Sequence, residues 1–559
     1  MQYNGERYLD FDEVTAWCQE VAKAMPQWVS LQEAGKSLNG KPIWLLTIGA
    51  AGEDRDMRPA FWLDGGTHAS EFTGVMLVLY TVSRWLEKLK EGDPKMVDWF
   101  SRHSAFVIPC ISPDGFDAMC KGEPFMRSTL RPGRDGATRI GLAPKDLDGD
   151  GAIRWMRWRH RAGAFVQDEQ QPLYMRPRTL DDDPEDAFFV ASEGVFLQWD
   201  GVKWINAPFQ FGLDLNRNFP GGWMPFSMFG MDGGTHPTSA PESRAVVEAF
   251  AARKGICAAV TNHTYTGCLL TQPYRADTPL GKGDIDMMHA LATDAVVGTD
   301  YDVFKVHPEF MYDPKKPITG VWADAMTTTF GIPGYTLEMW NPMKFAGIEL
   351  KNSLDFLMKP KTEDMRKLIS RMAQDPTLHS GWKAFEHPQL GTVEIGGLDY
   401  LRTVRNPPVP VLAEECGKGY AIIDRVRRAV PRVEATASVT ALGEECWRVE
   451  LVLENLGFLP TSGLSHGEHL QATPEVSARL VSADGMEVLE GAPHQPLHHL
   501  DGWGQTRVGG GRNAIYPSLS ARGHRARATW LVKGSADELT IDWIAGRAGR
   551  GQTTVSLAP

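Results

Sequence analysis

The sequence predicts an α/β domain over residues 1–385, followed by an all-β sandwich domain over residues 390–559. Up to about residue 360, short apolar runs alternate with helical patterns, which is typical of α/β domains. From about residue 390 the pattern changes, and "CWRVELVLENLGFLPTSG" alternates apolar with charged residues, as half-buried strands do. A chain of 559 residues is also too long for one ordinary core, so we expect at least two domains.

Four apolar runs in the first domain are predicted to be buried strands, because each ends in glycine or polar residues. They span residues 59–66, 104–115, 256–265 and 334–341. Ligands of open α/β sheets bind beyond the carboxyl ends of the strands. We therefore expect the polar residues at these ends to gather at one edge of the sheet: His68, Glu71, Asp114, His263 and Glu338.

Residues 121–212, between the second and third predicted strands, are rich in glycine, proline and charge and show no clear period. They are predicted to form a loop-rich insertion over one face of the domain. The basic stretch "RWMRWRHR", residues 154–161, lies between two acidic stretches, so we expect its charges to pair internally. In the second domain, "ATWLVKG" and "ELTIDWIAG" continue the strand pattern with turns between them, as in a β-sandwich.

The composition is that of a soluble globular protein, with 42% hydrophobic and 23% charged residues. A net charge of -12 disfavours nucleic-acid binding, which depends on neutralising phosphates. The sequence begins without the basic and apolar segments of a signal peptide, and no apolar run approaches the roughly eighteen residues of a membrane helix. Seven cysteines without a C-x-x-C pair suit a reducing compartment. We therefore expect a cytoplasmic protein, although a secreted chain trimmed of its signal would look the same; the oligomeric state stays open.

The first strand end places His68 three residues before Glu71 in "THASE". Positions three apart on a helix are neighbours, so both side chains can face the same way. Catalytic zinc takes three protein ligands and leaves a fourth position for water, and His263 lies at another strand end. The alternatives are an ordinary polar loop with a helix cap at residues 68–71 and a buried, hydrogen-bonded histidine at position 263.

Five motifs resemble, in order and character, those of the zinc metallocarboxypeptidase family of the carboxypeptidase A/B type: "THASE", "SPDGF", "GLDLNRNFP", "NHTYTG" and "GIPGYTLE". The resemblance covers roughly residues 8–345 without the insertion. The insertion and the tail beginning "GTVEIGGLDY" are similar to a large bacterial branch of that family with a C-terminal β-domain. The resemblance implies a mixed central sheet flanked by helices, one catalytic Zn2+ ion, and peptide or protein C-termini as substrate.

Carried over to this sequence, the resemblance makes His68, Glu71 and His263 the zinc ligands. Asp214 matches the carboxylate that orients a ligand histidine. Glu338 matches the general base that takes a proton from water as it attacks the carbonyl.

The resemblance also assigns residues to the substrate. Asn216 and Arg217 match the pair that holds the terminal carboxylate, for which the planar fork of arginine is suited. Either Arg127 or Arg131 polarises the scissile carbonyl, and Tyr312 is our candidate for the mobile tyrosine of the family. Ala325 stands where the family has a tryptophan near the side-chain pocket, so the residue preference cannot be transferred.

Asp146, Asp148 and Asp150 begin a sequence like that of a calcium-binding loop, which makes a Ca2+ ion a further candidate. The twelfth position is Arg157 instead of the glutamate that an EF-hand requires, and a simple charged turn is the alternative. For the whole protein, two alternatives remain beside a carboxypeptidase. One is a zinc amidase acting on cell-wall or γ-glutamyl peptides, and the other is a non-catalytic binding protein with a vestigial zinc pocket.

Overall fold

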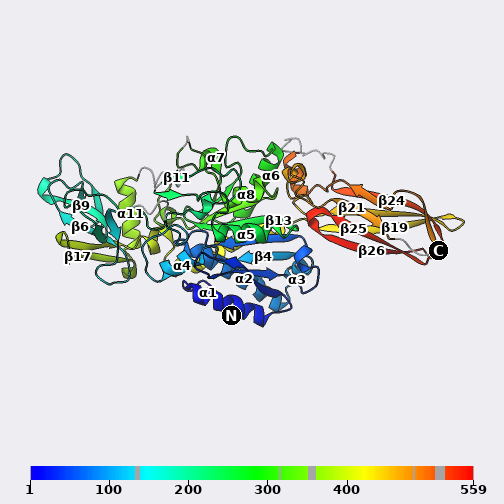
Figure 1. The fold of residues 1–559 in the computed structure, drawn as a ribbon, viewed down its shortest axis with the longest axis horizontal. Coiled ribbons are helices and arrows are strands. Elements are labelled where there is room, and N and C mark those ends of the chain that lie inside the picture. Colours follow the sequence, from blue (N-terminus) through cyan, green and yellow to red (C-terminus); the bar gives the residue numbers. More distant parts are fainter. Residues whose placement is uncertain are drawn as a thin grey trace.

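The computed structural model describes residues 2–132, 139–228, 230–313, 316–350, 360–481, 485–509 and 523–557. The molecule is elongated: an α/β body lies in the middle, with a smaller β-sheet at one end and a pair of β-sheets at the other (Figure 1).

Eight strands form the central sheet of the body, in the order β1-β2-β4-β3-β13-β16-β14-β15. Their bounds are β1 Val29–Lys36, β2 Pro42–Ile48, β3 Ala60–Gly65, β4 Ser104–Ile108, β13 Ile256–Thr264, β14 Cys268–Thr271, β15 Asp302–Lys305 and β16 Gly334–Met339. The four neighbouring strands β4, β3, β13 and β16 are parallel, whereas β1 with β2, β2 with β4 and β14 with β16 are antiparallel. The sheet is therefore mixed, and the four predicted strands are its parallel centre.

The second of these strands is shorter than predicted. β4 ends at Ile108, and α4 (Pro113–Cys120) begins with a proline in its first turn, where the missing N–H costs nothing. Asp114 lies in this helix, and its carboxylate accepts hydrogen bonds from Ser37 Oγ and Asn39 N. Asp114 therefore has a structural role within the body.

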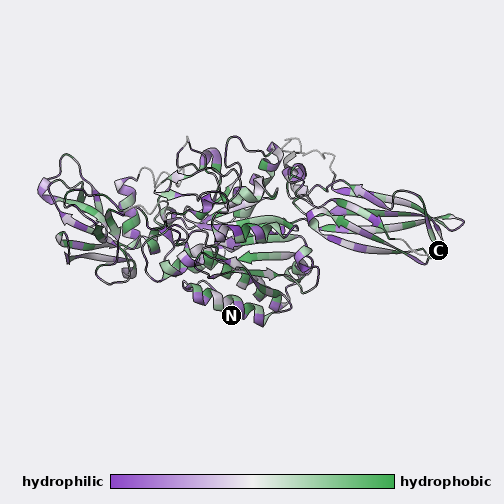
Figure 2. Ribbon diagram, viewed as in Figure 1, coloured by the Kyte–Doolittle hydropathy of each residue, from purple (hydrophilic) through white to green (hydrophobic). Residues whose placement is uncertain are grey.

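Helices cover both faces of the central sheet. One face packs against α1 (Phe11–Ala24), α2 (Phe72–Glu91), α6 (Lys282–Val296) and α12 (Val409–Arg428). The other packs against α5 (Pro241–Ala251) and α8 (Trp322–Thr328). Successive strand residues point to opposite faces, and in β3 Phe61 and Leu63 join the first core whereas Trp62 joins the second. Figure 2 shows the central strands as predominantly hydrophobic.

The remaining helices are α3 (Pro94–Arg102), α7 (Val306–Glu309), α9 (Pro342–Phe345), α11 (Thr362–Met372), α13 (Ser465–His469) and α14 (Trp503–Gly509). Within the described ranges, no helix has the length and apolar character that a membrane span requires.

The predicted loop-rich insertion contributes to a six-stranded antiparallel sheet, in the order β17-β18-β6-β9-β7-β8. The bounds are β6 Trp155–Arg159, β7 Phe165–Gln167, β8 Met175–Pro177, β9 Ala187–Ser192, β17 His379–His387 and β18 Gly391–Leu398. The insertion strands are only three to six residues long. Arg157 of β6 pairs with Glu394 of β18, 237 positions further along. Strands so short, with so distant a partner, leave no clear period in the sequence.

Four more short strands pair locally in this region: β5 (Gly141–Pro144) with β10 (Gly194–Leu197), and β11 (Ser227–Met228) with β12 (Met231–Asp232). The arginines of "RWMRWRHR" form ion pairs within the chain, as predicted: Arg154 with Asp150, Arg157 with Glu394, Arg159 with Asp186 and Arg161 with Glu185.

Two four-stranded antiparallel sheets at the C-terminus pack around one core, in the orders β19-β20-β24-β22 and β23-β21-β25-β26. The bounds are β19 Val433–Gly443, β20 Cys446–Asn455, β21 Val476–Leu480, β22 Met486–Glu490, β23 His494–Leu497, β24 Arg525–Gly534, β25 Glu538–Ala545 and β26 Arg550–Ser556. The sequence placed the start of this sandwich at residue 390, but its first strand begins at Val433. β18 belongs to the six-stranded sheet, and α12 packs its apolar side against α2 and α6 of the body.

Candidate active site

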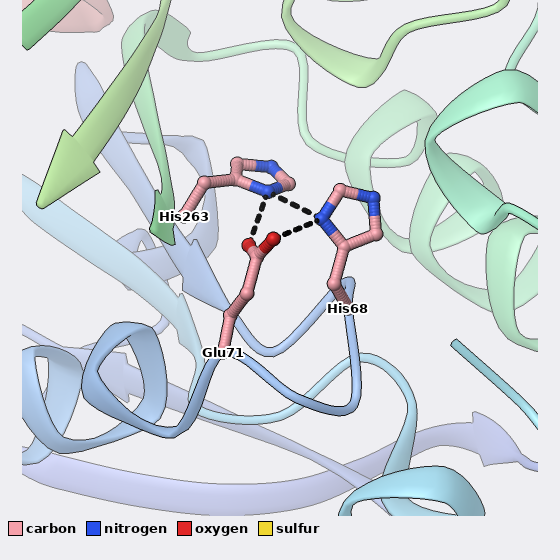
Figure 3. Close-up of side chains that lie close together, drawn as sticks. All are labelled: His68, Glu71 and His263. Carbon is pink, nitrogen blue, oxygen red and sulfur yellow. Dashed lines mark hydrogen bonds and ion pairs between the residues drawn. The ribbon is translucent and has the colours of Figure 1, made fainter. Parts of the chain in front are cut away.

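Three side chains converge at the carboxyl edge of the central sheet (Figure 3). His68 Nδ1 lies 3.0 Å from Glu71 Oε1, and His263 Nδ1 lies 3.0 Å from Glu71 Oε2. The two Nδ1 atoms are themselves 3.0 Å apart. All three side chains are buried, and among the described residues they form one of two groups that could hold a metal ion.

The strand ends explain why these side chains meet. After β3, Gly66 turns the chain at φ +65°, and a Cβ there would lie 2.8 Å from Val75 Cγ2, so glycine is required. Glu71 immediately precedes α2. On the neighbouring strands, His263 of β13 lies opposite Glu338 of β16 in parallel register.

Asp214 determines which nitrogen of His68 faces the other two side chains. Its Oδ1 lies 3.1 Å from His68 Nε2. Because a carboxylate only accepts hydrogen bonds, Nε2 is the donor and Nδ1 of the neutral ring keeps its lone pair. Burial alone would raise the pKa of Asp214, but Arg127, Arg217 and His68 outweigh it and hold the pKa well below its usual range. Asp214 therefore stays ionised and orients His68.

The donor set fits a zinc ion. Two imidazole Nδ1 atoms and one carboxylate, buried together, are the ligand types of catalytic zinc sites with three protein ligands and an open fourth position. The two Nδ1 atoms are 3.0 Å apart, which is close enough for both to bind one zinc ion at Zn–N distances of about 2.0–2.1 Å. The contact between Asp214 and His68 is the outer hydrogen bond that metal-ligating histidines normally make.

Glu338 supplies a further carboxyl group beside these three side chains. The pKa of the Glu338 carboxyl is raised to about 7, mainly because burial removes water from it. The negative charge of Glu71 also raises this pKa, whereas His263 and Arg127 lower it. A general base works best with a pKa near the operating pH. Glu338 therefore lies opposite His263 with a pKa raised toward neutrality.

The structure brings Arg127, and not Arg131, to this group. Arg127 Nη1 lies 3.0 Å from Glu71 Oε1, and its Nε lies 3.3 Å from Asp214 Oδ2. Arg131 instead donates from Nη1 to Ser239 Oγ at 3.2 Å. Of the two sequence candidates, only Arg127 is positioned to act on a bound substrate.

A cavity of about 820 Å3 opens beside these groups and is lined by Arg127, Asp214, Arg217, Tyr312 and Glu338 among others. This volume is typical of sites for small-molecule or short peptide ligands. Burial raises the pKa of the Tyr312 hydroxyl, and Glu338 adds to the effect. The candidate tyrosine therefore lies in the same cavity as the candidate base.

Arg217 and Asn216 lie in a short turn directly after Asp214. The guanidinium of Arg217 lies 5.0 Å from the centre of the Phe226 ring, and its Nε is buried without a hydrogen-bond partner among the described residues. Asn216 Oδ1 accepts a hydrogen bond from the backbone N–H of Trp322 at 2.9 Å, which fixes its amide. Ala325, which stands where the family has a tryptophan, is buried in α8. Trp322, three residues earlier, is buried in the same helix.

The carboxylates of the acidic turn at residues 146–150 accept hydrogen bonds from within the chain. Asp146 and Asp148 lie with Glu193 in the second group of potential metal ligands. Backbone amides of the turn donate to Asp146 and Asp148, further amides donate to Glu193, and Arg154 donates to Asp150. These contacts favour the charged-turn alternative and give calcium no support.

Sequence reasoning missed Arg405, a charged residue of the cavity that also contacts the metal-ligand group. Its Nη1 lies 3.5 Å from Glu71 Oε1. Arg405 follows β18, in a segment that the sequence assigned to the C-terminal sandwich. No local signal singled it out, because the contact between residues 405 and 71 depends on the path of the chain after the six-stranded sheet.

Comparison with protein families matches residues 14–368 to a model described as zinc carboxypeptidase. Residues 433–556 match a model described as a domain of unknown function.

Similar proteins of known name include carboxypeptidase B of Astacus astacus, 33% identical over 109 residues, which cover 20% of this chain and 34% of that protein. Carboxypeptidase B of Homo sapiens is 27% identical over 139 residues, which cover 25% of this chain and 32% of that protein. The aligned stretch thus spans about a third of these relatives. Carboxypeptidase A from Helicoverpa armigera is a similar solved structure, with 17% identity, a TM-score of 0.41, and coverage of 66% of this chain and 74% of that one.

Proposed function

This chain belongs to the zinc carboxypeptidase family, and we propose that it is a zinc metallopeptidase that hydrolyses the peptide bond next to a free C-terminal carboxylate. The observation that carries the proposal is Arg217, whose buried Nε lacks a hydrogen-bond partner in the described chain. A buried donor costs free energy unless it is bonded. A carboxylate is the ligand that the planar fork of arginine fits best, and Arg217 lines the same cavity as Glu338.

The proposed mechanism divides the work among the residues of this cavity. When held by His68, Glu71 and His263, a zinc ion supplies Lewis acidity and makes water more acidic. Glu338 takes a proton from the water that attacks the scissile carbonyl, and returns it to the leaving amine as the C–N bond breaks. Arg127 stabilises the negative charge that develops on the carbonyl oxygen.

Arg217 and Asn216 select the bond that is cut. By holding the terminal carboxylate, they fix the register of the peptide so that its last peptide bond reaches Glu338. Binding energy from these remote contacts aligns the reacting atoms and lowers the barrier.

The test is mass spectrometry of a mixed peptide library incubated with the zinc-loaded protein, with and without a zinc chelator. We expect ladders shortened only from the C-terminus, which disappear with the chelator and return on adding zinc. The zinc-loaded Glu338→Gln variant is the control and should produce no ladder.

The same experiment separates the alternatives. Absence of shortening with zinc bound would contradict the proposal, and cleavage of γ-glutamyl or cell-wall peptides would then identify an amidase. Zinc bound without hydrolysis of either class would leave a non-catalytic binding protein. The chain has both the ligand set and Glu338, which a vestigial pocket has no reason to keep together.

A further inference from the structure

We propose that Arg405 binds a carboxylate carried by the substrate residue on the acyl side of the scissile bond, so that the protein prefers an acidic residue there. This inference rests on the proposed peptidase function and adds a second substrate contact to it. Arg405 lies outside residues 14–368, the segment that matches the family.

Arg405 is held in place by its neighbour in the chain. Asn406 is fully buried, donates from Nδ2 to Ser70 O at 2.8 Å and accepts from Thr73 N at 3.1 Å. These two bonds attach the segment to the loop that supplies Glu71. The position of Arg405 relative to the metal-ligand group is therefore fixed by backbone contacts on both sides of Glu71.

The guanidinium of Arg405 has unused donors. Its side chain is 15% exposed, and its contact with Glu71 at 3.5 Å is the ion pair it makes among the described residues. It lies over the rings of Tyr265 and Phe125, at 5.0 and 5.7 Å from their centres. Its Nε is buried without a partner in the described chain, as is that of Arg217. Arg217 and Arg405 thus each line the cavity with an Nε that is free to bond a ligand.

Arg127 lies between the other two arginines in the chain of contacts, because it contacts both Asp214, three residues before Arg217, and Glu71, which Arg405 also contacts. Arg217 follows Asp214, which contacts His68, whereas Arg405 contacts Glu71 and Tyr265. A peptide with its terminal carboxylate at Arg217 and its scissile carbonyl at Arg127 continues past Glu71 toward Arg405. The group that meets Arg405 therefore belongs to the acyl side of the substrate.

The ion pair of Arg405 is shared with a nearer arginine. Its Nη1 lies 3.5 Å from Glu71 Oε1, whereas Arg127 Nη1 lies 3.0 Å from the same oxygen. A carboxylate on the substrate would give Arg405 a charged acceptor of its own in a largely buried position, where unpaired charge is costly.

The test compares two peptides that differ only in having glutamate or glutamine before the last residue. For the wild-type protein we expect kcat/KM to favour the glutamate peptide by about 10- to 100-fold, as a charged hydrogen bond would give. Arg405→Gln should bring this ratio to within about threefold of one, and Arg405→Lys should give an intermediate ratio, because lysine keeps the charge without the planar fork.

Arg428→Gln is the matched control. Arg402 lines the cavity beside Arg405 and is therefore unsuitable as a control, whereas the side chain of Arg428 in α12 is 59% exposed, pairs with Asp424 and lies outside the cavity lining, so Arg428→Gln should keep the wild-type ratio. A wild-type ratio near one, or an unchanged ratio in Arg405→Gln, would overturn the proposal. Zinc content measured for every variant separates loss of the metal from loss of selectivity.

Peptide binding provides a second test, which does not require catalytic activity. Calorimetry on the zinc-loaded Glu338→Gln protein, with and without Arg405→Gln, measures binding of the same two peptides. A preference for the glutamate peptide that disappears with Arg405→Gln supports the proposal, and equal binding of both peptides contradicts it. If wild-type protein cleaves neither peptide but cleaves a γ-linked glutamyl peptide in an Arg405-dependent way, the carboxylate contact stands and the carboxypeptidase proposal fails.

Discussion

The cavity has two charged walls that are built in different ways. The Arg217 wall, residues 214–217, is one compact turn in which Asp214 contacts His68, and Asp214 and Arg217 line the cavity. The Arg405 wall, residues 399–406, reaches the metal-ligand loop through Asn406 and Ser70, which are 336 positions apart. His68, Glu71, His263 and Glu338 are thus positioned by the ends of neighbouring parallel strands, whereas Arg405 reaches the same cavity from a segment outside the central sheet.

The largest expected effect comes from replacing Glu338, which lies in the cavity that both walls line. Glu338→Gln removes the proton acceptor and should lower kcat/KM by about 10²- to 10⁴-fold, the usual contribution of a general base. Its zinc content should equal that of the wild type, which elemental analysis can check. Retained activity would show that another residue accepts the proton and that Glu338 is not the general base.

Asp214→Asn tests the Arg217 wall. An asparagine can no longer hold His68 as a charged acceptor, and zinc affinity should fall by about 10- to 100-fold, as for other outer hydrogen-bond partners. Competition with a chromophoric chelator measures the affinity. Asp117→Asn is a suitable control, because Asp117 pairs with Lys41 and Lys121 and not with His68, Glu71 or His263. Unchanged zinc affinity in Asp214→Asn would contradict the role of Asp214.

Asn406→Ala tests the Arg405 wall. It leaves Ser70 O and Thr73 N without their buried partner and should lower the free energy of unfolding by about 1–3 kcal/mol, measured by urea denaturation. The preference for glutamate over glutamine should fall, because Arg405 is no longer held in place. Zinc affinity should fall less in Asn406→Ala than in Asp214→Asn. An equal or larger fall would mean that the Arg405 wall affects zinc binding as strongly as the Arg217 wall does.

The same contrast explains what the sequence could predict. The central parallel strands and the residues at their ends followed from apolar runs that stop at glycine, histidine or glutamate, because such strands bury both faces. The choice between Arg127 and Arg131 required the structure, since both lie in one short stretch. The strands of the insertion and the place of Arg405 were not predictable, because they depend on pairings such as Arg157 with Glu394 that join distant parts of the chain.

The smallest effect concerns the six-stranded sheet, from which the Arg405 wall continues. Asp168, next to β7, is buried and accepts hydrogen bonds from Arg366 of α11 at 2.8 and 2.9 Å. Burial alone would raise the pKa of Asp168, but Arg366 and the backbone amides of Gln170 and Gln171 lower it below its usual range. The folded state therefore holds the proton less tightly than the unfolded chain.

Because the pKa of Asp168 is lower in the folded state, the free energy of unfolding depends on pH. The stabilisation is present above the unfolded pKa of about 3.9 and is lost as the pH falls through the lower folded value. Asp168→Asn should lower the free energy of unfolding by about 0.5–1.5 kcal/mol at pH 7, and the difference from wild type should shrink as the pH falls below about 4. Denaturation at several pH values measures it. A difference that grows toward low pH would contradict the assignment.

The measurement that tests the central claim most directly compares two peptides of one sequence, one with a free C-terminal carboxylate and one with a C-terminal amide. The ratio of kcat/KM between them, for zinc-loaded wild type and for Arg217→Gln, isolates the contact between Arg217 and the terminus. We predict rapid removal of the last residue from the free acid, little reaction of the amide, and a much smaller ratio in Arg217→Gln. Equal hydrolysis of acid and amide by the wild type would contradict the proposal that this protein acts at a free C-terminus.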